Sequence, residues 1–164
     1  MQTPSDTILD FLSGRRSVIL STLDEKGLPH TSYAPFLWHE ERCYIYISEA
    51  ARHTAHLMER PLCSLLFIED ENEAERIFAR RRVMLSCGVE EIPDERPLHG
   101  EILTGMEERF GAIVATLRGL QDFHLFALAP RSGEAVFGFG EAYLIEKPFE
   151  TIVPKRGGHP RRQG

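Results

Sequence analysis

Short apolar segments alternate with polar turns along the chain, and most of these segments have the composition of β-strands. They are rich in β-branched and aliphatic residues, and the turns between them contain glycine, proline or charge. Strands are expected at 17–23, 28–38, 43–48, 62–68, 82–92, 123–129 and 135–145. Hairpin turns are expected at 24–27, 39–42 and 130–133. The pattern therefore favours an antiparallel sheet.

A helical period replaces the strand pattern in three segments. Residues 4–14 follow the hydroxyl of Thr3, which suits a helix N-terminus, and residues 49–60 end before a proline. Residues 96–120 carry an apolar stripe at helical spacing, so a helix interrupted near Gly105 is expected there.

Together these elements predict a mainly β (α+β) fold, a six- to seven-stranded antiparallel split β-barrel with flanking helices. Helices are inserted singly between hairpins, which does not match the strict strand–helix alternation of a parallel sheet. Closure into a barrel also removes exposed sheet edges. Residues 1–148 are expected to form the barrel domain. Residues 149–164 are rich in proline, glycine and arginine and lack a core pattern, which predicts a flexible basic tail.

Composition and charge narrow the range of partners. The formal net charge is −6, and a net acidic surface argues against nucleic acid as the main partner. No segment has the length and hydropathy of a membrane span, and the first residues lack the features of a signal peptide. A cytoplasmic protein without a membrane partner is therefore expected. Cys43, Cys63 and Cys87 are widely spaced within apolar segments and are expected to be buried thiols.

A candidate anion site falls at the start of the helix expected at 49–60. Ser48 ends the preceding strand, and Arg52 and Thr54 lie on the first turn of the helix. A hydroxyl, a guanidinium and the N–H groups of a helix N-terminus together suit a phosphate or a carboxylate.

The histidines have more ordinary explanations than metal binding. His53 and His56 share a helical face with Glu59, but no third histidine lies in a matching motif, so a dedicated zinc site is disfavoured. Surface or strand positions are expected for His30, His39, His99 and His124.

The segments 27–36, 47–57 and 138–143 resemble the pyridoxamine-phosphate-oxidase-like, or flavin-reductase-like, split-barrel superfamily, in which the corresponding strand and helix hold the flavin phosphate. A longer series of motifs is similar to the HugZ/HutZ branch of that superfamily. These motifs lie, in order, at 32–36, 48–53, 68–71, 78–80, 109–111, 120–123 and 138–142. The resemblance covers roughly residues 15–160, which is nearly the whole chain.

The resemblance implies a function and a set of site residues. The HugZ/HutZ family binds haem at a homodimer interface and degrades it to release iron, and its iron ligand near the C-terminus matches His159. Asp122 matches an acid linked to that ligand, where a carboxylate raises the basicity of the imidazole. His53 matches a histidine near the subunit interface, and Arg82 matches a basic residue on the strand that faces haem. Electrons would come from an external donor, because no cofactor-binding domain for one is visible.

Two other functions fit the same residues. An FMN-dependent oxidoreductase would use Ser48, Arg52 and Thr54 to bind the flavin phosphate. A haem storage or delivery protein would need the same ligand, His159, without degrading haem. The sequence leaves haem degradation, haem storage and FMN binding open.

Overall fold

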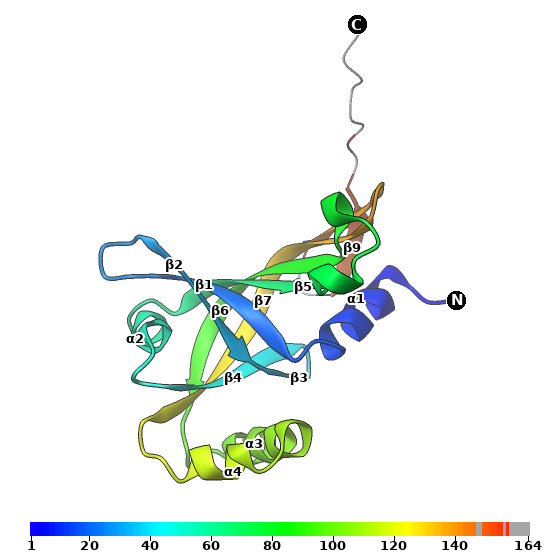
Figure 1. Ribbon diagram of the computed structural model, residues 1–164. Helices are drawn as coiled ribbons and strands as arrows, with labels where there is room; N and C mark the ends of the chain where they lie inside the picture. Colours follow the sequence, from blue (N-terminus) through cyan, green and yellow to red (C-terminus); the bar gives the residue numbers. More distant parts are fainter. Residues whose placement is uncertain (147–148, 156, 158–164) are drawn as a thin grey trace, which may run out of the picture.

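The strands of the protein pair antiparallel in one sheet. The computed structural model describes residues 1–146, 149–155 and 157, and within them nine strands follow the order β2-β1-β5-β6-β7-β4-β3, with β8 paired to β7 and β9 to β8. Their bounds are β1 (Ser17–Leu23), β2 (Pro29–Pro35), β3 (Leu37–His39), β4 (Arg42–Ser48), β5 (Leu62–Ile68), β6 (Arg82–Ile92), β7 (Phe123–Gly138), β8 (Glu141–Glu146) and β9 (Thr151–Pro154). The sheet curls strongly on itself (Figure 1).

Four α-helices lie around the sheet within the described residues: α1 (Pro4–Ser13), α2 (Arg52–Glu59), α3 (Pro97–Phe110) and α4 (Ile113–Arg118). Short 3-10 helices at Glu71–Glu73 and Ile77–Ala79 join β5 to β6. The helices α3 and α4 lie together at one end of the sheet, α2 lies beside the β1–β2 hairpin, and α1 lies on the opposite side (Figure 1). None of the described helices is long and apolar enough to cross a membrane.

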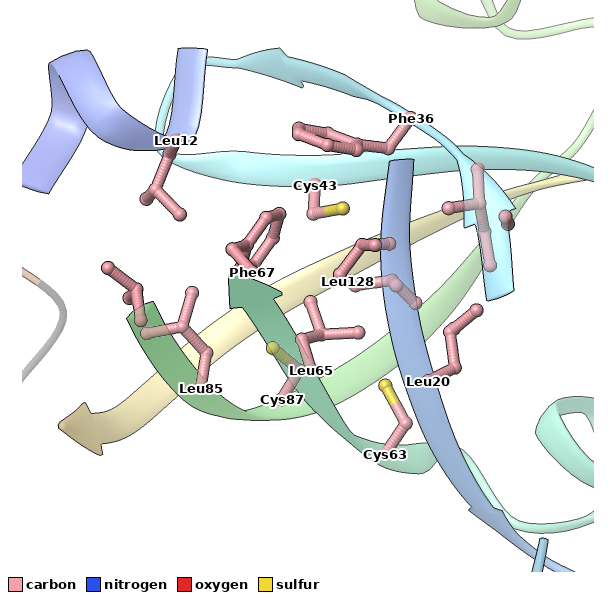
Figure 2. Close-up of a cluster of buried hydrophobic side chains, with 14 of the residues drawn as sticks. Leu12, Leu20, Phe36, Cys43, Cys63, Leu65, Phe67, Leu85, Cys87 and Leu128 are labelled. Carbon is pink, nitrogen blue, oxygen red and sulfur yellow. The ribbon is translucent and has the colours of Figure 1, made fainter. Parts of the chain in front are cut away.

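Strand alternation fills the barrel interior. Along β5, Cys63, Leu65 and Phe67 are buried, and the residues between them face outward. Figure 2 shows side chains from several strands and from α1 converging on this interior. The ring of Phe67 meets Phe36 edge-on with 5.0 Å between the centroids. All three cysteines are buried free thiols, as expected.

A second, smaller core joins the sheet to α3 and α4. It consists of Tyr44, Ile92, Ile102, Leu103, Met106, Val114, Leu125 and Ala127. The predicted helix interruption at Gly105 is wrong, because the break falls at Gly111, where φ is 88°. Gly105 lies inside α3, and a Cβ there would come within 2.9 Å of the Leu37 side chain. The glycine therefore allows α3 to pack closely against the sheet.

The predicted hairpin turn at 130–133 is also wrong. The strand β7 runs unbroken through this segment, and the chain reverses at Gly140 instead. Pro130 is accommodated because the pairing with β4 ends at Leu128 and the pairing with β8 begins at Ser132. Its missing N–H therefore falls where β7 changes partner, next to a bulge in β7 at Arg131, opposite Ser86 and Cys87 of β6.

The mainly β antiparallel barrel is confirmed, but the described residues contain nine strands, not six or seven. The segment 28–38 divides into β2 and β3 at Phe36, whose ring is buried. A further strand, β9, forms inside the segment that was expected to be a tail, because it pairs with β8 along its length. Phe149 is buried as well, so the barrel extends past residue 148.

Candidate functional site

Ser48 and Asp122 meet where β4 ends beside the start of β7. The Ser48 hydroxyl donates a 2.8 Å hydrogen bond to Oδ2 of Asp122. The backbone N–H of Glu49 donates to the carbonyl oxygen of Asp122 at 2.8 Å, and the N–H of Ala50 donates to the Ser48 hydroxyl at 3.0 Å. The half-buried Asp122 carboxylate is thus oriented by Ser48.

Both hydroxyl groups of the predicted anion site already donate hydrogen bonds to other groups of the protein. Thr54 is fully buried, and its hydroxyl donates to the carbonyl oxygen of Ser48 at 2.5 Å. The Ser48 hydroxyl is bonded to Asp122. Ala51 gives the helix no side-chain cap, so the exposed Arg52 and the first N–H groups of α2 are the donors that remain for an anion.

His53 and His56 face the β1–β2 hairpin from α2. Both are buried, with Nδ1 of His53 2.7 Å from the Ser32 hydroxyl and Nδ1 of His56 2.9 Å from the Thr22 hydroxyl. The His30 ring meets His56 edge-on at 5.1 Å between centroids. Burial lowers the pKa of His53, and the neighbouring His30 and His56 lower it further. No group of three or more histidine, cysteine or acidic side chains in the described chain is arranged to hold a metal ion.

Arg82 lies at the other end of the sheet. It begins β6, it is half-buried, and its Nη1 donates to the carbonyl oxygen of Arg80 at 3.0 Å. The far end of β6, at Ile92, pairs with Leu125, close to Asp122 in the chain. The 11 residues of β6 span roughly 35 Å. A single chain therefore does not bring Arg82 to Asp122.

The segment before Arg82 is anchored by an ion pair between the buried carboxylate of Glu69 and the exposed side chain of Arg81. The Glu69 carboxylate accepts hydrogen bonds from the backbone N–H of Arg81 at 2.8 Å and from its Nε at 2.7 Å. Burial by itself would raise the pKa of Glu69, but the bonds from Arg81 outweigh it and lower the pKa. Glu69 therefore fixes the start of β6, where Arg82 lies.

The predicted site residues form two separate groups within the described part of the chain. Ser48, Arg52, His53, Thr54 and Asp122 gather around the start of α2. Arg82 lies apart from them at the far end of β6. His159, the predicted iron ligand, falls outside the described residues.

A broad concavity lies on the outer face of β1, β5, β6, β7 and β8. Its volume is about 770 Å³, and its apolar floor includes Ile19, Leu66, Met84 and Leu144, with serine hydroxyls between them. These side chains alternate along the strands with those of the barrel core. An apolar sheet face of this kind is typical of a surface that associates with a partner.

His124 lies beside the loop before α2 and forms contacts that the sequence did not indicate. Its Nε2 lies 2.7 Å from Oε1 of Glu49, and its Nδ1 lies 2.6 Å from Oε1 of Glu91. Both partners are distant in the chain, so no local motif indicates the bridge. Partial burial opposes a charge on the ring, but the bonds to the two carboxylates prevail and raise the pKa of His124.

Comparison with known proteins identifies the family. Residues 4–137 match the family model described as pyridoxamine 5'-phosphate oxidase, which together with the fold places the chain among split-barrel proteins of that family. Heme oxygenase HutZ of Vibrio cholerae is 40% identical over 138 residues, which are 84% of this chain and 78% of HutZ. The chain therefore belongs to the HugZ/HutZ branch of the family, as its motifs predicted.

Solved structures agree with this assignment. The crystal structure of Vibrio cholerae HutZ, described as a heme storage protein, has a TM-score of 0.75 at 37% identity and covers 84% of this chain and 95% of its own. Campylobacter jejuni ChuZ has a TM-score of 0.87 at 28% identity, covering 99% of this chain and 68% of its own. A heme-binding protein of Mycobacterium smegmatis, at 17% identity, shares the fold with a TM-score of 0.79 and covers 89% of this chain and 59% of its own.

Proposed function

We propose that this protein binds haem as a homodimer and degrades it oxidatively, which releases the iron. The observation that carries the proposal is the position of the predicted haem residues in a chain 40% identical to heme oxygenase HutZ. Asp122 and Arg82 lie at opposite ends of β6 and β7. A two-fold dimer whose axis runs across the strands, midway between these ends, would bring the Asp122 end of one chain to the Arg82 end of its partner.

The outer concavity supports the dimer. It spans five strands, and its apolar residues, which include Ile19, Leu66 and Met84, come from β1, β5, β6 and β8. Self-association buries such a face, and each buried methylene stabilises the assembly by about 0.8 kcal/mol. The predicted haem residues lie beyond the two ends of this surface, so a dimer formed here supports a shared site.

The chain's residues have distinct parts in the proposed site. His159 supplies the imidazole for the iron, and the Asp122 carboxylate, held by Ser48, accepts a hydrogen bond from the N–H of that imidazole. Arg52 supplies a cation for the acidic groups of haem, and Arg82 is the candidate distal group on the strand that faces haem, with a catalytic part. His53 holds α2 against the sheet through Ser32. Haem, as the substrate, brings the redox chemistry, and an external donor in the cytoplasm supplies the electrons.

The hydroxyl geometry favours haem over FMN. A flavin phosphate needs several free donors, whereas the Thr54 hydroxyl is bonded to the carbonyl oxygen of Ser48 and the Ser48 hydroxyl to Asp122. Haem needs a ligand imidazole and cations for its carboxylates, and these do not depend on the two hydroxyls.

The test adds haemin to the purified protein and then ascorbate in air, with the Soret band followed over time. We expect a Soret band on binding, and its decay with release of ferrous iron to a chelator. His159→Ala is expected to lose the band, and His39→Ala, a change on β3 away from both groups, is expected to keep it.

Two results of this experiment contradict degradation, and a third contradicts the ligand assignment. A stable Soret band under reductant indicates storage, and yellow colour with flavin fluorescence indicates an FMN protein. An unchanged spectrum and unchanged decay in His159→Ala remove the ligand assignment, and His53→Ala is then the next variant to measure.

A further inference from the structure

His124 connects three parts of the protein at the edge of the candidate site. It lies on β7, opposite Ile47 of β4, and its side chain is 22% exposed. Its Nε2 faces Glu49, in the loop between β4 and α2, at 2.7 Å, and its Nδ1 faces Glu91, near the end of β6, at 2.6 Å. One imidazole ring therefore joins β7 to both of its neighbours.

The bridge requires a particular charge state. An ionised carboxylate only accepts hydrogen bonds, and a neutral imidazole carries only one N–H. With neutral His124, one ring nitrogen would present its lone pair to a carboxylate oxygen. Only the imidazolium donates to Glu49 and Glu91 at once, so the observed geometry is that of a charged ring.

The same backbone segments also hold the Asp122 carboxylate. Glu49 follows Ser48, which donates to Asp122, and the N–H of Glu49 donates to the Asp122 carbonyl oxygen. Asp122 precedes His124 by two residues on the partner segment. A movement of Glu49 or His124 therefore also moves the backbone that carries the Ser48–Asp122 hydrogen bond.

We propose that His124, as an imidazolium bonded to Glu49 and Glu91, is a positioning residue for the Asp122 carboxylate. The value of this role rests on the proposed function, in which Asp122 acts on the haem ligand. When His124 loses its proton, Glu49 and Glu91 repel one another across the ring, and the loop before α2 is released from β7. The charged groups that face the ring among the described residues are these two carboxylates, and Asp122 is turned toward Ser48.

The first test uses the haem-free protein, so its outcome does not depend on haem binding. The His124 ring and the backbone amides of Glu49 and Asp122 are followed by NMR from about pH 5 to about pH 9, a range that spans histidine titration. We expect both amides to shift with the midpoint of His124. The midpoint should lie above the ordinary value of about 6.5, because both carboxylates favour the charged ring.

Variants separate positioning from a structural role. His124→Gln should abolish the shared titration of the two amides, and Glu91→Gln should lower the His124 midpoint, because one charged acceptor is lost. His39→Gln, whose ring lies 3.5 Å from Glu101, is the matched control and should leave the titration unchanged. The proposal would be overturned if the NMR shifts of the Glu49 and Asp122 amides did not follow the titration of His124. Should His124→Gln fail to fold, Glu91→Gln decides, because its side chain is 45% exposed.

The second test uses the haem complex. His124→Gln should bind haem within about threefold of the wild-type affinity, because a contact outside the ligand set is lost. Its rate of haem decay should no longer fall as pH rises through the His124 midpoint, whereas the wild type and His39→Gln keep this dependence. An unchanged pH profile in His124→Gln would contradict the positioning role. Absence of haem binding in the wild type would overturn the proposed function, and the NMR result would still decide whether the bridge exists.

Discussion

The pKa values of two imidazole side chains are shifted in opposite directions, and the partners of each ring decide the direction. His53 is buried against the Ser32 hydroxyl, and burial lowers its pKa, with repulsion from His30 and His56 adding to the effect. His124 lies between two carboxylates that outweigh its partial burial and raise its pKa. A hydroxyl bonds to either form of the ring, but a carboxylate stabilises the charged one.

The lowered pKa of His53 predicts how acid affects the stability of the fold. Because its pKa is lower in the folded protein than in the unfolded chain, its contribution is complete above about pH 6.5 and is lost as pH falls through the folded value. His53→Gln keeps a partner for Ser32 without titrating. We expect the free energy of unfolding, measured with urea, to fall less between about pH 7.5 and about pH 5 in His53→Gln than in the wild type. Equal losses in both proteins would show that His53 titrates normally.

The sequence predicted the residues of the α2 start but not their partners. Ser48, Arg52 and Thr54 lie where the strand-to-helix pattern placed them. That Ser48 bonds to Asp122 could not be predicted, because the two are separated by 74 positions and the contact depends on the β4–β7 register. The role of His124 has the same origin, since Glu49 reaches it from the loop after β4 and Glu91 from β6.

At the scale of elements, strands were predicted well where alternation ended at an unambiguous turn, as for β1, β5 and β6. The sequence Pro130–Gly133 was taken for a turn because proline and glycine usually mark one. In the structure, both residues are accounted for by contacts with neighbouring strands. Pro130 lies where β7 changes partner, and Gly133 lies where β7 crosses close to β6. Such constraints come from the closure of the barrel and have no local signal.

A pair of glycine substitutions tests this explanation. A Cβ at Gly133 would come within 2.2 Å of the carbonyl oxygen of Met84, whereas a Cβ at Gly100 on α3 has no atom within 4 Å. Gly133→Ala is expected to destabilise the protein by about 1–3 kcal/mol or more through overpacking. Gly100→Ala is expected to stabilise it by about 0.5–1 kcal/mol, because alanine is the better helix former. Urea denaturation measures both, and a neutral Gly133→Ala would mean that β6 and β7 separate at little cost.

At the scale of the whole molecule, the barrel holds apart the two groups of residues that the proposed haem site needs. Asp122 and the start of α2 lie at one end of β6 and β7, and Arg82, anchored through Glu69 and Arg81, lies at the other. The apolar concavity lies on the sheet between these ends. An 18.7 kDa chain with this layout is expected to complete its site only by pairing with a second copy.

Mixing two inactive variants tests whether the site is shared between chains. Arg82→Ala and Asp122→Ala are each expected to lose most haem turnover, because each removes one half of both sites in the dimer. A mixed dimer holds one site with both changes and one site with neither. After free subunit exchange half of the dimers are mixed, so about a quarter of the wild-type activity should return. The chain carrying both changes, mixed with either single variant, restores nothing and is the control. Failure of the two single variants to complement, in a preparation that light scattering shows to contain dimers, would mean that Arg82 and Asp122 of one chain serve the same site.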